Sequence, residues 1–89
     1  MTALEHEVLD VIRRIFATEL EHSGTVEPEH HLQRDLHVDS LNAVILAVGL
    51  EDHFRVRLTQ EDTVGITTVG GLMVRVAELV QAAREEPAP

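Results

Sequence analysis

The chain has 89 residues, of which 44% are hydrophobic, but its only aromatic side chains are two phenylalanines and it contains no cysteine. Sixteen acidic against seven basic residues give a formal net charge of −9. This charge disfavours nucleic acid and anionic lipid as partners and favours basic protein surfaces, and the lack of cysteine excludes a disulfide framework and a zinc-thiolate site.

The length predicts one domain, residues 1–89, with an aliphatic core. The first ten residues lack the basic and apolar segments of a secretory signal. No apolar run is long enough to span a membrane. We therefore expect a cytoplasmic protein without membrane insertion.

The first predicted helix runs from Leu4 to Leu20, where apolar residues recur at helical spacing and charged residues occupy the opposite face. Thr2 is its predicted N-cap, because Glu5 follows at the capping-box spacing. Ser23 and Gly24 predict that the helix has ended. Residues 24–39 then form a long connection without a clear period.

That connection contains Pro28 and four irregularly spaced apolar residues, Val26, Leu32, Leu36 and Val38. Their spacing does not fit a strand, so we interpret them as anchors that hold a loop onto the helices. A connection this long in a compact domain is usually functional.

The second predicted helix is Ser40–Phe54, with Asp39 or Ser40 as its cap. Gly49 lies in its interior, where glycine costs ~1 kcal/mol relative to alanine, and a close helix crossing would justify that cost. Apolar residues at i, i+3, i+4 and i+7 predict a partly exposed docking stripe, followed by two acids. The stripe and its acids are Leu41, Val44, Ile45, Val48, Glu51 and Asp52.

Thr59–Asp62 is a second capping signature and predicts a single short turn of helix. The last helix begins within Ile66–Val69, with Thr67 or Thr68 as its cap, and residues 85–89 are expected to form a frayed tail beyond an ordered core of about 3–84. The predicted fold is all-α: an antiparallel four-helix bundle with three main helices and a short third helix.

Ser40 stands at a helix start, where free N–H groups and the helix dipole favour an anion. A capping role is the commoner use of such a serine. Catalysis by Ser40 is disfavoured, because the chain lacks the Gly-x-Ser-x-Gly elbow and is too small for a triad with a substrate cleft. We therefore expect no enzyme.

The stretch "DLHVDSLNAVILAVGLEDHF", residues 35–54, resembles the acyl carrier protein signature, in which Asp-Ser-Leu opens the second helix. The upstream "RDL" and the later "ITTV" fall where that family has corresponding elements, so the resemblance covers nearly the whole chain. It implies that Ser40 receives phosphopantetheine from coenzyme A through a magnesium-dependent transferase. The thiol of that arm would hold an acyl or aminoacyl group as a thioester.

The resemblance also implies that Asp39 helps to position the phosphopantetheinyl transferase and its metal, and that the stripe of the second helix forms the recognition face. The implied partners are that transferase and the ligase, synthase or transferase enzymes that load and process the cargo. Such carriers usually work as monomers, and their aliphatic core can part to shelter a carried chain.

The sequence departs from the family pattern at several positions. His37 replaces the glycine that commonly follows Asp-Leu, Asn42 and Ile45 replace acids of fatty-acid carriers, and Arg55 and Arg57 add positive charge. These changes favour a specialised carrier of secondary metabolism or of a dedicated ligase. The alternatives are the housekeeping fatty-acid carrier and an unmodified acidic helical module that docks onto or regulates an enzyme.

Six histidines raise the possibility of a metal site. His30 and His31 are adjacent and point apart in most conformations, and the others lie in separate predicted elements. No histidine pair at helical spacing and no thiolate accompanies them, so we predict no metal site.

Overall fold

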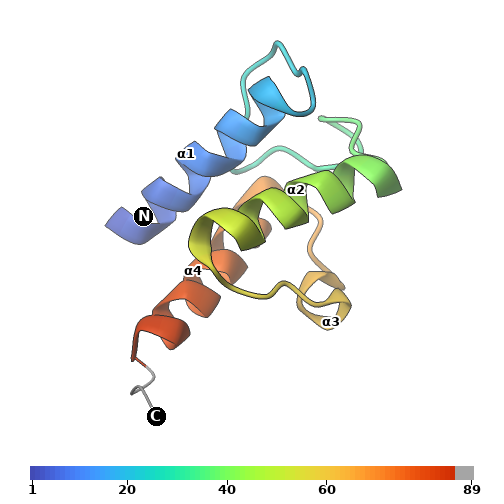
Figure 1. Ribbon diagram of the computed structural model, residues 1–89. Helices are drawn as coiled ribbons and strands as arrows, with labels where there is room; N and C mark the ends of the chain where they lie inside the picture. The colour runs from blue at the N-terminus through green and yellow to red at the C-terminus, as the bar shows by residue number, and fades with distance from the viewer. Residues whose placement is uncertain (86–89) are drawn as a thin grey trace.

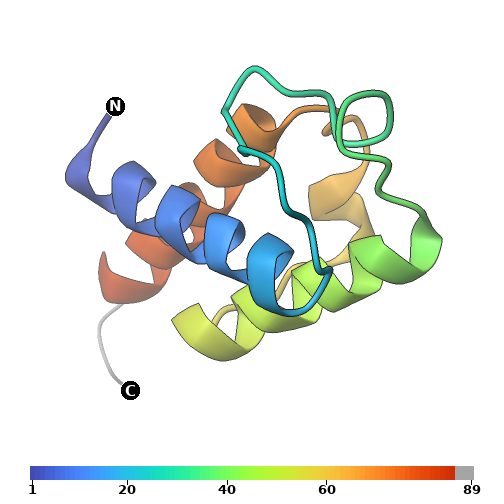
Figure 2. The ribbon, with the colours of Figure 1, turned by 90° about the horizontal axis from the view of Figure 1, so that it is seen from above.

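The computed structural model describes residues 1–85 as a helical bundle (Figures 1 and 2). The helices are α1 (Ala3–Thr18), α2 (Ser40–Phe54), α3 (Gln60–Thr63) and α4 (Val69–Glu85). Helix α1 packs against both α2 and α4 and runs opposite to each of them in both views. No strand occurs among residues 1–85, so the predicted all-α bundle with a short third helix is confirmed. Most of the predicted tail lies outside the described residues.

The first helix begins as predicted and ends two residues early. Thr2 and Glu5 form the expected capping box, with N–H···O distances of 2.8 and 3.1 Å. At the other end Glu21 has a φ of +52°, a left-handed conformation that stops helical propagation. Leu20 therefore lies beyond the helix, although its side chain still packs against the core.

The core is aliphatic, with Phe16 as its one large ring. Its fully buried side chains come mainly from α1 and α4, and among residues 1–85 no buried residue is polar or charged. Helix α2 contributes only Leu46 and Leu50 to the buried set. Most of the apolar surface of α2 therefore faces away from the bundle, which places α2 at the edge where a partner or a ligand can reach it.

The long connection is a loop fastened to the start of α4. Val26, Leu36 and Val38 are buried, as the anchoring interpretation predicts. The backbone of the loop also bonds to the segment entering α4: Leu32 N–H donates to the Thr67 carbonyl at 2.8 Å, and two further bonds reach back from α4. These are Val69 N–H to the His30 carbonyl at 3.0 Å and Gly70 N–H to the Pro28 carbonyl at 2.7 Å.

The two later caps also follow the sequence. Thr59 and Asp62 close a capping box around α3, and Thr68 caps α4 by accepting the Gly71 N–H at 3.0 Å. Helix α3 differs from the others because none of its residues is buried. Within residues 1–85, no helix combines the length and apolar character needed to cross a membrane.

Candidate functional site

Ser40 is the first residue of α2, and its side chain does not cap the helix. Asp39 is the N-cap: its Oδ1 accepts the Asn42 N–H at 2.8 Å, and its carbonyl accepts the Ala43 N–H at 2.9 Å. Ser40 is exposed, and its hydroxyl forms no hydrogen bond with another of residues 1–85. The structure thus resolves which residue caps the helix and leaves the serine oxygen accessible to a reagent.

The local field favours an anion at this oxygen. The first N–H groups of α2 point toward the region around Ser40, and the helix dipole is positive there. No acidic residue occupies the first turn of α2, so only the capping carboxylate of Asp39 opposes that field. A phosphate ester on Ser40 would therefore be stabilised by the helix that carries it.

The approach to Ser40 contains a left-handed residue. His37 has a φ of +55°, the conformation for which glycine is best suited. The family that the sequence resembles commonly has a glycine at this position, and His37 adopts the left-handed region in its place. The turn leading into α2 is therefore formed without glycine.

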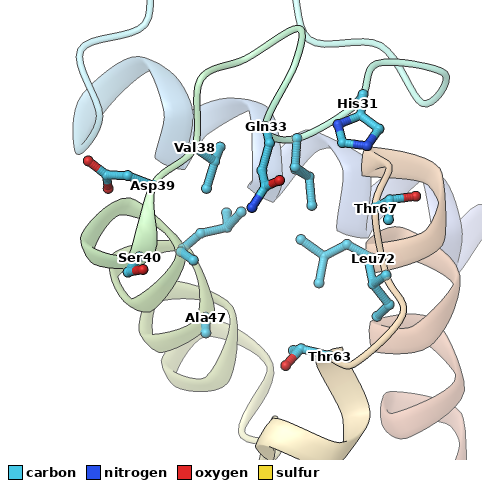
Figure 3. A pocket seen from close by; sticks show the side chains of 13 residues that line it. His31, Gln33, Val38, Asp39, Ser40, Ala47, Thr63, Thr67 and Leu72 are labelled. Carbon is cyan, nitrogen blue, oxygen red and sulfur yellow. The ribbon is translucent and has the colours of Figure 1, made fainter.

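A cavity of about 330 Å³ opens beside Ser40 between α2, the long loop and the segment that joins α3 to α4 (Figure 3). Its aliphatic lining includes Leu46, Ile66 and Leu72, and the small side chain of Ala47 lies on its α2 wall. Gln33 directs its amide into the space from the loop. The cavity has the size of a small-ligand site, and its composition suits a flexible, mainly apolar chain.

The predicted docking stripe is mostly exposed. Leu41, Val44 and Val48 are 68%, 58% and 48% exposed. Ile45 is only half-buried rather than freely exposed, and together with Val44, Val48 and Ile15 of α1 it lines a second groove. Three large apolar side chains therefore face solvent along α2, starting one residue after Ser40.

The two acids beyond the stripe differ in their surroundings. Asp52 is exposed, whereas Glu51 is partly buried and accepts the Leu58 N–H on Oε2 at 2.8 Å. Glu51 thereby fastens the turn that follows α2. Arg55 and Arg57 are exposed just beyond it, and Arg14 Nη2 lies 3.0 Å from His53 Nδ1, so basic side chains stand beside the two acids at the far end of α2.

Two histidines have structural roles that the sequence did not indicate. His30 Nδ1 accepts the Glu27 N–H at 3.0 Å, and His31 Nδ1 accepts the Arg34 N–H at 3.1 Å, so each ring closes a turn of the loop. Among residues 1–85, no group of three or more histidine, cysteine, aspartate or glutamate side chains is arranged to hold a metal ion.

The lining of the cavity was not predicted from the sequence. Gln33, Ala43, Ala47, Ile66 and Leu72 come from four separate segments and meet only in the folded chain. One local signal existed: Ala43 and Ala47 are small residues four apart on the helix that Ser40 opens.

Comparison with known proteins agrees with this geometry. A family model described as a phosphopantetheine attachment site matches residues 10–76. A protein from Streptomyces coelicolor named acyl carrier protein is 36% identical over 83 residues, which cover 91% of this chain and 90% of that protein. The meromycolate extension acyl carrier protein of Mycolicibacterium smegmatis is 35% identical over 81 residues, covering 89% of this chain and 81% of that protein.

A solved structure gives the same result. A candidate acyl carrier protein from Mycobacterium tuberculosis matches with a TM-score of 0.68 at 32% identity. The match covers 85% of this chain and 97% of that one. Sequence and backbone therefore point to one family over most of the chain.

Proposed function

This chain belongs to the acyl carrier protein family, and on that premise we propose that Ser40 is its attachment residue for phosphopantetheine. The cofactor of the family is phosphopantetheine, and its members are carriers rather than enzymes. One observation supports Ser40 above all: its hydroxyl is exposed at the positive end of α2 while Asp39 performs the capping.

The residues around Ser40 fit the proposed arm. The first turn of α2 would hold its phosphate, and the neighbouring cavity offers an aliphatic space to the group it carries. When bound, the arm supplies a terminal thiol, which the cysteine-free chain lacks, to carry acyl or aminoacyl groups. The proposed location of this carrier is the cytoplasm.

Asp39 would serve the modifying enzyme as well as the helix. Its Oδ1 caps α2, and a carboxylate has a second oxygen that can approach a metal ion held by the transferase. Leu41, Val44 and Val48 would form the apolar part of the recognition face, with Ile45 at its edge and Asp52 and Glu51 at its far end.

The charge pattern of α2 supports a specialised carrier. The family resemblance implies acids at the positions of Asn42 and Ile45 in fatty-acid carriers, and Arg55 and Arg57 are exposed beyond the helix. Enzymes that bind an acidic second helix through basic patches would gain less attraction here. We propose that the partners of this chain belong to secondary metabolism or to a dedicated ligase.

A fatty-acid role is the second candidate, favoured by the 35% identity to a carrier named for meromycolate extension. The two candidates differ in how partner enzymes respond to charge. If the carrier is specialised, Asn42→Glu combined with Arg55→Glu will raise the rate at which a fatty-acid synthase transferase loads the arm. An unchanged or lower rate in the double variant favours the fatty-acid role.

The attachment itself is tested with a matched pair of serine variants, because the chain contains only Ser23 and Ser40. Each variant is incubated with coenzyme A, magnesium and a broad-specificity phosphopantetheinyl transferase, and its intact mass is measured. Ser23→Ala should gain the arm as the wild type does, and Ser40→Ala should not. A wild-type chain that stays unmodified would instead support the docking module that needs no arm.

A further inference from the structure

One wall of the cavity beside Ser40 is held weakly. Thr63, the last residue of α3, lines it together with Ile66. Helix α3 buries no residue, and Val64, which follows it, is 76% exposed. Gly65 follows with a φ of +85° and no neighbour close to the position of a Cβ. A short helix without buried side chains, next to an open glycine, has little packing to oppose its movement.

The opposite wall is fixed. Residues 28–38 are tied to the segment entering α4 by backbone bonds, including Leu32 N–H to the Thr67 carbonyl. Gly70 lies so close to this loop that an added Cβ would stand 3.0 Å from the Pro28 carbonyl oxygen. Displacement of this wall would break several backbone hydrogen bonds together, whereas no backbone hydrogen bond joins α3 to another helix within residues 1–85.

A single pair of side chains ties α3 to α4. Arg75 Nε donates to Asp62 Oδ1 at 3.1 Å, and Arg75 Nη2 contacts the same oxygen. The Asp62 side chain is only 13% exposed, and its other oxygen accepts from Thr59. Within the described chain, every other hydrogen bond of residues 59–66 closes inside that segment.

We propose that the Asp62–Arg75 pair is a latch that limits the cavity beside Ser40 and so restricts the length of the acyl group it accepts. When the latch is closed, it holds Thr63 and Ile66 in the lining of the cavity, which also includes Ala47. Open, it frees α3 to move about Gly65 and widens the space for a longer chain. This proposal rests on the proposed function, because the length of the cargo matters only if Ser40 carries an arm.

The movement of α3 is tested on the unmodified chain. Amide hydrogen exchange is compared between the wild type and Arg75→Gln at Val64 and Ile66, whose N–H groups bond to Gln60 and Thr63 carbonyls. Exchange there should rise on the order of two- to fivefold, the effect expected for a surface ion pair, with no change in α1. Arg13→Gln is the matched control, since it breaks an ion pair with Glu27 away from the cavity.

The effect on cargo is tested on chains loaded with octanoyl or hexadecanoyl arms by the transferase, with loading verified by intact mass. For each variant we subtract the Tm of the octanoyl form from the Tm of the hexadecanoyl form. This difference should be larger in Arg75→Gln than in the wild type, and Arg75→Lys should give an intermediate value. Equal exchange at Val64 and Ile66, or an unchanged Tm difference, overturns the latch. Failure of Ser40 to accept any arm overturns the proposed function instead, while the exchange result still decides whether α3 is latched.

Discussion

Gly49 of α2 crosses α1 so closely that a Cβ added at this residue would lie 2.7 Å from Ile15 Cδ1 and 3.2 Å from Ile15 Cγ1. Ile15 is buried, so it has little freedom to withdraw. The crossing accounts for a glycine that costs ~1 kcal/mol of helix propensity relative to alanine. It also sets α2 against α1 with Leu41, Val44 and Val48 facing outward.

Gly49→Ala should therefore lower the free energy of unfolding despite the better propensity of alanine. The gain of ~1 kcal/mol from propensity is opposed by roughly 1–3 kcal/mol of overpacking, for a net loss of about 1 kcal/mol. Ile15→Val removes Cδ1, the nearer of the two atoms that the new methyl meets. In that background Gly49→Ala should become neutral or stabilising, as measured by urea denaturation of all four chains. Stabilisation by Gly49→Ala in the wild-type background would contradict the close crossing.

A glutamate scan along α2 should separate the exposed stripe from its half-buried neighbour. Val44→Glu should change the free energy of unfolding by no more than about 0.5 kcal/mol, because Val44 faces solvent. Ile45→Glu should cost about 1–3 kcal/mol, because Ile45 is half-buried. Both should slow loading by a cognate enzyme, and Val44→Glu is the cleaner test. Normal loading of Val44→Glu would remove Val44 from the recognition face.

Asp39 should show two separable roles. Asp39→Ala removes the cap and should cost about 1 kcal/mol of stability, whereas Asp39→Asn keeps an oxygen for the Asn42 N–H and should cost only a few tenths. Both variants should be modified more slowly by the transferase, since both lack the carboxylate charge. Modification of Asp39→Asn at the wild-type rate would show that the charge of Asp39 has no part in the reaction.

The contact with Arg75, followed by hydrogen bonds from Thr59, lowers the pKa of Asp62 from 3.8 to about 2. Because the pKa falls on folding, this carboxylate stabilises the fold above about pH 4 and loses its effect as the pH drops through about 2. In Arg75→Gln the pKa should rise toward 3.8 without reaching it, because the Thr59 bonds persist. Carboxyl carbon NMR titration measures both values, and an unchanged pKa in Arg75→Gln would show that the ion pair is not formed.

The helices and their caps could be predicted because their signals are local. Thr2 with Glu5, Thr59 with Asp62 and Thr68 each mark a helix start within a few residues of sequence, and the structure forms all three caps. The end of α1 was predicted two residues late, because a left-handed Glu21 has no signature in a polar run.

The cavity and its fastenings could not be predicted, because they depend on contacts between distant segments. Nothing near Arg75 identifies Asp62 as its partner, and nothing near Gly70 indicates that Pro28 lies against it. The stripe on α2 was predicted from period alone, which does not distinguish a freely exposed Val44 from a half-buried Ile45. Likewise the bond from Leu58 to Glu51 is made only when the chain turns back after α2.

The site of attachment can be measured directly, because the arginine positions isolate Ser40. Trypsin cleavage after Arg34 and Arg55 releases residues 35–55, in which Ser40 is the only hydroxyl-bearing side chain. Residues 15–34, released by cleavage after Arg14, contain Ser23 and two threonines. After treatment with transferase and coenzyme A, mass spectrometry should find the mass of the arm on peptide 35–55 alone. An arm on peptide 15–34, or on no peptide while a known carrier is modified in the same tube, would contradict attachment at Ser40.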